Sequence, residues 1–261
     1  MLFAGSPLWL DFILLLAIAV AAYESGRLLG VRLLGRAAGE ADEAEDAADG
    51  HALSGVFGLL ALLLAFSFGM ALNRYEERRE LVVAEANALS TFASRVELLA
   101  AEDRTPVREL LAQYGRSRLA FGGATNEADA NAAYAEAARM HARIGDLVYA
   151  SLARTPPDPR GPLLIQPFNE AGDIAAERLA AREARLPEAV LLLLCIFAIC
   201  GAGLLGYNRA ASQRTHRPAA LLFLTLLAVA FVTVLDLDRP RSGSILVPQQ
   251  AMERQVAELV S

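Results

Sequence analysis

The sequence predicts an all-α membrane protein with four transmembrane helices and a helical domain inserted between the second and third of them. Two observations predict this fold. The 261 residues are 55% hydrophobic yet 21% charged, and the hydrophobic residues gather in four long runs separated, two and two, by a polar segment. Such a composition is too apolar for an ordinary soluble domain and too charged for a purely buried bundle.

Three of the four runs contain no charged residue. Ala52–Leu72 has 21 residues, Ala189–Tyr207 has 19 and Pro218–Leu235 has 18, and at 1.5 Å per residue each approaches or exceeds a hydrocarbon core of about 30 Å. The first run, Leu8–Tyr23, contains Asp11, which we expect near a membrane interface. A signal peptide is an alternative for this run, but no basic region precedes it. A soluble bundle of long core helices is the alternative for all four.

The runs divide the chain into four parts. Residues 1–72 hold transmembrane helices 1 and 2, residues 73–185 form the helical domain, residues 186–235 hold helices 3 and 4, and residues 236–261 form a C-terminal tail. Apolar side chains from Val82 to Ala100 recur about every 3.5 residues, as at a helix–helix contact. No glycine or proline separates them from the second run, so one unbroken helix of about 45 residues is expected.

Helix signals continue through the polar segment, where no alternating strand pattern occurs. Thr105-Pro106 suits a helix start, and the prolines of residues 155–162 exclude a helix there. The acidic stretch between the first two runs, Glu40–Asp49, is expected to be a solvated loop. The further helices expected are Thr105–Phe121, Glu127–Arg154 and Phe168–Ala184.

The stretch Leu62–Asn87, LLLAFSFGMALNRYEERRELVVAEAN, carries a family resemblance. It resembles the second membrane helix of bacterial bestrophins and its cytosolic extension, although Glu76 replaces the usual tryptophan. The matching positions are Phe66, Asn73, Arg74, Tyr75, Glu77, Arg79, Leu81 and Asn87. Over nearly its full length the chain looks more like an uncharacterised bacterial bestrophin-like family, through this block, the Asn169-Glu170 helix and the tail Asp236-x-Asp238-Arg239-Pro240-x-x-Gly243.

This resemblance implies a pentameric ion channel of the bacterial inner membrane. The second helix would line a narrow apolar neck, and the termini and the inserted domain would lie in the cytoplasm. The positive-inside rule favours the opposite side, because short loops count most in it and the two short loops hold six arginines, although the flanks of the long segment are also rich in arginine. The six loop arginines are Arg27, Arg32, Arg36, Arg209, Arg214 and Arg217.

One face of the second helix suits a pore. On a 100° wheel six positions fall within about 80°, and a ring of large apolar side chains there could gate by dewetting. Alternatively, these side chains and glycines pack between helices. Anion and cation paths are both compatible with the neighbouring charges. The pore-lining candidates are Gly55, Leu59, Leu62, Phe66, Gly69 and Asn73.

Asp236 and Asp238 close the fourth run, where acids oppose the helix dipole. They could bind a cation, pair with an arginine (Arg178 or one of Arg74–Arg79), or belong to a turn that ends the helix. Asn169 and Glu170 are expected as polar groups at a helix start. The candidates for this tail clasp and its supports are Arg74, Glu77, Arg79, Asn87, Asn169, Glu170, Arg178, Asp236, Asp238, Arg239, Pro240 and Gly243.

Other function classes have little support in the sequence. All 24 basic residues are arginine against 30 acids, for a net charge of −6, which argues against nucleic-acid binding. Three scattered histidines and the apolar Cys195 and Cys200 offer no metal site, and no catalytic or phosphate-binding motif is present, so neither a cofactor nor an enzyme is expected. Two hypotheses remain: a homo-oligomeric channel that passes small inorganic ions across the lipid bilayer, or a non-conducting scaffold or sensor whose insert binds a partner.

Overall fold

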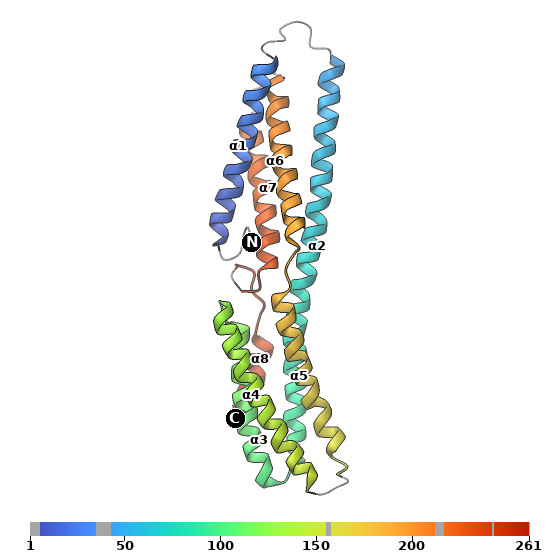
Figure 1. Cartoon of the computed structure of the whole chain (residues 1–261), viewed down its shortest axis with the longest axis vertical. Coiled ribbons are helices and arrows are strands. Elements are labelled where there is room, and N and C mark those ends of the chain that lie inside the picture. The colour runs from blue at the N-terminus through green and yellow to red at the C-terminus, as the bar shows by residue number, and fades with distance from the viewer. Residues whose placement is uncertain (1–5, 35–42, 155–157, 212–216, 242, 261) are drawn as a thin grey trace. The chain divides into compact units, whose positions relative to one another are not determined.

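The computed structural model describes residues 6–34, 43–154, 158–211, 217–241 and 243–260 (Figure 1). Within these ranges every regular element is a helix. The helices are α1 (Leu8–Leu34), α2 (Glu43–Val96), α3 (Ala101–Gly123), α4 (Glu127–Ala153), α5 (Gly161–Glu183), α6 (Glu188–Ala211), α7 (Arg217–Asp238) and α8 (Gln250–Val260). Among the described residues, four helical stretches are long and apolar enough to cross a membrane. The predicted all-helical class with four such spans is therefore confirmed.

The chain divides into two compact units. The span unit comprises Met1–Asn73 and Arg185–Arg239, and the insert unit comprises Arg74–Ala184 and Pro240–Ser261. The span unit thus holds α1, the first part of α2, α6 and α7. The insert unit holds the rest of α2 with α3, α4, α5 and α8.

Close backbone packing joins α1 to α6 in the span unit. A Cβ atom on Gly26 would lie 1.9 Å from the carbonyl oxygen of Gly203, and one on Gly206 would lie 1.9 Å from that of Tyr23. Only glycine therefore fits at these two contacts, as in membrane helix pairs that meet through small residues. Tyr23 and Leu224 are buried beside this contact and bring α7 onto α1.

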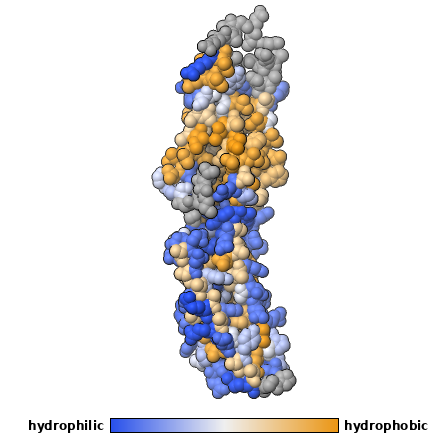
Figure 2. All heavy atoms as spheres, in the orientation of Figure 1, coloured by the Kyte–Doolittle hydropathy of each residue, from blue (hydrophilic) through white to orange (hydrophobic). Residues whose placement is uncertain are grey.

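The surface of the span unit is apolar. Figure 2 shows hydrophobic side chains over its exposed face, whereas the insert unit is mainly hydrophilic. Large exposed hydrophobic residues occur on all four of its helices, and examples are Trp9, Ile13, Phe66, Leu192, Ile196, Leu222 and Leu226. A soluble protein seldom exposes so large an apolar area, so this surface suits contact with lipid or with other subunits.

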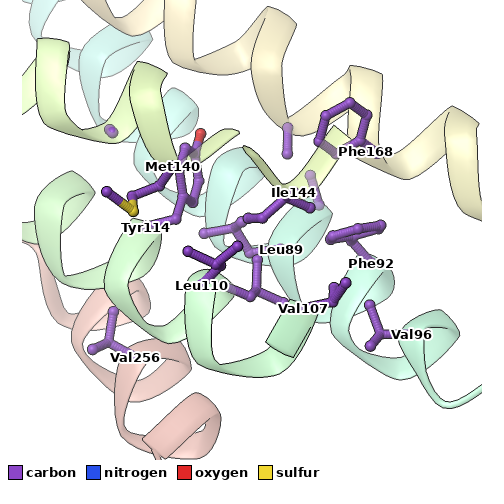
Figure 3. Close-up of a cluster of buried hydrophobic side chains, with 14 of the residues drawn as sticks. Leu89, Phe92, Val96, Val107, Leu110, Tyr114, Met140, Ile144, Phe168 and Val256 are labelled. Atoms are coloured by element: carbon purple, nitrogen blue, oxygen red, sulfur yellow. The ribbon is translucent and has the colours of Figure 1, made fainter. Parts of the chain in front are cut away.

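The insert unit has its own apolar core, which Figure 3 shows at close range. Four of the stripe positions predicted on α2 are buried, including Val82, Leu89 and Val96, although Ala100 lies beyond the helix and is exposed. The core takes side chains from five helices. Those labelled in Figure 3 are Leu89, Phe92, Val96, Val107, Leu110, Tyr114, Met140, Ile144, Phe168 and Val256.

Helix boundaries differ from the prediction at two starts. α3 begins at Ala101 instead of Thr105, with Pro106 inside the helix, because the turn that ends α2 leads directly into it. α5 begins at Gly161 instead of Phe168, since a proline in the first turn favours a helix start. Asn169 and Glu170 therefore lie in the interior of α5. The prediction that they are polar groups at the start of a helix is wrong.

The connection before α2 and the C-terminal tail also differ from the prediction. Residues 43–49 of the expected acidic loop belong to α2, while Glu40 and Asp42 lie outside the described residues. The tail carries α8, which the sequence analysis did not predict. Met252 and Val256 of α8 are buried in the insert core, so the tail is part of that unit.

Candidate functional site

The exposed face of α2 in the span unit holds the residues predicted to line a pore. Leu59, Leu62 and Phe66 are 53%, 51% and 63% exposed within the chain. A Cβ atom on Gly55 or Gly69 would meet nothing within 4 Å. These side chains are therefore only partly covered by the described residues, and the choice between lining a pore and packing between helices stays open.

The exposed side of α2 becomes polar in the insert unit. Asn73, the last residue of the span unit, is exposed, and so are Glu77 and Asn87 further along. Arg79 is also exposed and pairs with Glu76 at 3.2 Å, so both signs of charge are present. Arg74 is half-buried.

A polar cluster at the end of α7 ties together the start of α1 and the end of α7 within the span unit. Arg239 donates to Asp11 Oδ2 at 2.5 Å and to the Ser6 carbonyl oxygen at 2.8 Å, and the Ser6 hydroxyl donates to the other Asp11 oxygen at 2.6 Å. Asp238 accepts a hydrogen bond from the Leu186 backbone N–H at 2.8 Å. Asp238 thus fixes the chain just before α6.

Asp236 is buried at the same end of α7. Its pairing with an arginine stays a prediction. The helix ends at Asp238, and Pro240 and Gly243 follow it as expected for a terminating turn.

A buried ion cluster lies at the centre of the insert unit. Glu85 of α2 and Arg118 of α3 are both fully buried, and Glu85 bonds the guanidinium groups of Arg118 and Arg178. Burial would raise the pKa of Glu85, but the nearby charges of Arg178 and Arg118 outweigh it and hold that pKa below its usual value. Glu85 is therefore a carboxylate shared by two arginines.

Aromatic and amide groups complete the surroundings of this cluster. The Phe121 ring lies 4.6 Å from Cζ of Arg118 and 5.6 Å from Cζ of Arg178, within cation–π range. Arg178 also donates to Gln249 Oε1 at 3.2 Å, which connects α5 with the segment before α8. Arg178 was predicted as a partner of Asp236, whereas its contacts here are with Glu85 and Gln249.

The remaining candidates stand apart from this cluster. Asn169 and Glu170 are exposed and line an open groove along α5. Among the described residues no group of histidine, cysteine, aspartate and glutamate side chains is placed to hold a metal ion. Within the span unit the clasp candidates gather around Arg239, and within the insert unit some lie around Arg178 and others on the surface of α5.

Sequence reasoning missed Glu85, Arg118 and Asp11 as partners in buried pairs. Glu85 had a signal, because it follows Val82 by three positions and precedes Leu89 by four, on the apolar stripe of α2. A charged residue at such a position calls for a buried partner. The sequence carries no signal that identifies the partners, because Arg118 and Arg178 lie 33 and 93 positions away along the chain.

Comparison with known proteins agrees with this architecture. The family model for the bestrophin-like domain matches residues 19–252. The chain belongs to the bestrophin-like family. No curated protein matches the sequence.

Solved structures share the bestrophin-like fold over almost the whole chain. A bacterial bestrophin homologue from Klebsiella pneumoniae, solved with zinc phasing, is 17% identical with a TM-score of 0.66, covering 96% of this chain and 97% of that one. A variant of this homologue gives 15% identity, a TM-score of 0.68 and coverage of 98% and 100%. A proline-to-alanine variant of a membrane protein is 16% identical with a TM-score of 0.63, covering 97% of this chain and 98% of that one. With its apolar helices, this bestrophin-like chain is a multi-pass membrane protein.

Proposed function

We propose that this protein is a homo-oligomeric ion channel of the bacterial inner membrane, with α2 facing the permeation path. The observation that carries the proposal is the exposed apolar face of α2, where more than half of the surface of Leu59, Leu62 and Phe66 is left uncovered by the described residues. Symmetry around an axis would place these residues in rings, and the family resemblance favours five copies.

The glycines of α2 support an oligomer over simple exposure to lipid. A glycine inside a helix costs about 1 kcal/mol relative to alanine, and a close packing partner usually explains it. Within the part of the chain that the structure describes, Gly55, Gly58 and Gly69 have no such partner, in contrast to Gly26 and Gly206. A neighbouring subunit would provide the missing contact.

The chemistry along α2 suits a pore that narrows in the membrane. Rings of Leu62 and Phe66 would form an apolar neck that conducts only when wetted, and Asn73 would place amides at its water-facing end. Glu77 and Arg79 further along carry opposite charges, so the permeant ion is left to measurement.

The decisive experiment combines subunit counting with ion flux. The full-length protein, purified in detergent, is sized by light scattering and then reconstituted into liposomes holding a salt gradient. We expect an oligomer that passes ions. A strict monomer without flux would falsify the channel proposal.

Replacing Phe66 tests the neck directly. Phe66→Ala removes a large apolar side chain from each ring, so a wider and more easily wetted neck should raise the single-channel conductance or the leak at rest. Leu222→Ala on α7 is the matched control, because it is equally exposed at 61% but lies on another helix. Equal conductance in Phe66→Ala and wild type would remove Phe66 from the neck.

A non-conducting scaffold or sensor is the second function. The observation that favours it is the open groove along α5, whose rim carries Glu170, Asp173 and Glu177 beside Ile165 and Ile174. An acidic groove with apolar patches could hold a basic partner segment. A stable oligomer that never conducts, while a Glu170→Lys change abolishes capture of a partner, would favour this function over the channel.

A further inference from the structure

A small cavity in the insert unit is ringed by arginines. Arg78 of α2, Arg178 and Arg182 of α5, and Arg241 line a space of about 40 Å³. Among the residues that the structure describes, no acidic side chain lines this space. Such a gathering of guanidinium groups around one opening is unfavourable unless something negative sits between them.

Backbone carbonyl groups hold several of these arginines in place. Arg78 donates to the carbonyl oxygens of Ala181 and Ala184 at 2.9 and 2.8 Å, and Arg182 donates to that of Ala124 at 3.0 Å. These contacts orient the guanidinium groups at the C-terminal ends of α5 and α3. A carbonyl oxygen is a neutral acceptor, so these bonds by themselves do not cancel the charge of a guanidinium group, and the Glu127 carboxylate lies 4.0 Å from Nε of Arg182.

The ion cluster behind the cavity adds further positive charge. Glu85 is one carboxylate shared by Arg118 and Arg178, which leaves the trio with a net charge of about +1 at neutral pH. One terminal nitrogen of Arg118, Nη1, is buried without a hydrogen-bond partner. The pKa of Arg241 is lowered by burial and by the like charge of Arg178, as expected for two guanidinium groups that face one site.

We propose that this cavity binds a small inorganic oxyanion such as phosphate, between Arg178 and Arg241 and bordered by Arg78 and Arg182. The planar fork of arginine matches the oxygen spacing of such anions. A water molecule requires about 10–15 Å³ by the same kind of volume measure, so a cavity of about 40 Å³ admits a small oxyanion and excludes a nucleotide.

Gly122 keeps the cavity open. A Cβ atom at this position would lie 3.0 Å from a terminal nitrogen of Arg178 and 2.1 Å from Oε1 of Gln249. A side chain there would therefore push the guanidinium and the amide out of their positions. The proposed site thus depends on a residue without a side chain as well as on the arginines.

Titration of the intact protein with inorganic phosphate tests the site. In detergent, at constant ionic strength set with chloride, we expect phosphate to bind saturably by calorimetry and to raise the midpoint of thermal unfolding. Arg241→Gln should weaken phosphate binding at least tenfold. The fold should survive this change, because Arg241 is only half-buried. Its hydrogen bond to the Val247 carbonyl oxygen, 3.2 Å long, is a single bond to a neutral acceptor.

Two further variants make the test specific. Arg143→Gln, an exposed arginine on α4, should bind phosphate as wild type does, and Gly122→Ala should weaken it as Arg241→Gln does. No saturable binding to wild type, or equal binding to wild type and Arg241→Gln, would overturn the site. The test needs no ion flux, so a protein that binds phosphate but does not conduct would contradict the channel proposal alone.

Discussion

At the residue scale, Glu85 supplies the negative charge that two buried arginines require. Removing that charge leaves Arg118 and Arg178 facing each other without compensation, and breaking a buried ion pair on one side costs about 3–5 kcal/mol. We therefore expect Glu85→Gln to lower the midpoint of thermal unfolding strongly in detergent. Glu80→Gln, an exposed position on the same helix, should change stability by no more than about 0.5 kcal/mol.

Acid should have the same effect as the Glu85 variant. The folded pKa of Glu85 is lowered from 4.5, so the folded state binds fewer protons than the unfolded state in that range. Its stabilisation is complete above about pH 4.5 and is lost as pH falls through the lower folded value. A Glu85→Gln protein that unfolds at the wild-type temperature would show that the carboxylate is not needed.

His141 predicts a second pH dependence, closer to neutrality. Its ring stacks on Phe168 with 4.0 Å between centroids, and Nε2 lies 3.1 Å from the Phe168 carbonyl oxygen. Burial lowers the pKa of His141, although this hydrogen bond and Asp173 oppose the shift. Below about pH 6.5 the unfolded chain gains a proton that the folded chain resists, so stability falls as pH drops.

Replacement of His141 with an aromatic residue that cannot titrate isolates this effect. His141→Phe keeps the stacking on Phe168, so the midpoint of thermal unfolding should change less between about pH 7.5 and about pH 5.5 than in wild type. The same change in both proteins would assign the acid sensitivity to other groups.

At the element scale, the sequence predicted the helices that its periodicity marks and missed those that depend on distant contacts. The unbroken α2 followed from an apolar run and a 3.5-residue stripe with no glycine or proline between them. α8 has only 11 residues, and a helix this short is stable mainly through the core that receives it. Glu85 could be recognised as buried from its place on the stripe, but its arginine partners could not, because pairing is set by tertiary structure.

The contact between α1 and α6 also depends on backbone proximity that the sequence did not reveal. A Cβ on Gly206 would meet the Tyr23 carbonyl oxygen at 1.9 Å, whereas one on Gly203 would stay 3.7 Å from its nearest neighbour, the Ala22 carbonyl oxygen. Gly206→Ala should therefore force the helices apart and destabilise the protein by about 1–3 kcal/mol. Gly203→Ala, three positions away, should be neutral or slightly stabilising because alanine favours the helix.

Thermal unfolding in detergent, together with the yield of folded protein, measures this difference. The two substitutions lie three positions apart in the same helix and add the same methyl group, so detergent and hydrophobicity effects cancel. Equal stability of the two would mean that α1 and α6 do not approach as closely as their glycines allow.

At the scale of the whole molecule, the ends of the chain bear on which side of the membrane the insert occupies. The pair between Arg239 and Asp11 puts the start of α1 and the end of α7 at one end of the span unit, and α8 packs into the insert core. Four spans would place both termini and the insert on one side. The arginines of the short loops favour an external location for the termini and the insert, whereas the bestrophin-like layout favours a cytoplasmic one.

We expect the insert to be cytoplasmic, and cysteine labelling of spheroplasts tests this. In a background with Cys195→Ala and Cys200→Ala, one protein carries Ala142→Cys on the exposed side of α4 and another carries His51→Cys near the start of the second apolar run. A membrane-impermeant maleimide should label position 51 in intact spheroplasts and position 142 only after permeabilisation. Labelling in the reverse order would mean that the arginines of the short loops, and not the family layout, set the orientation, because the two positions flank the same apolar run.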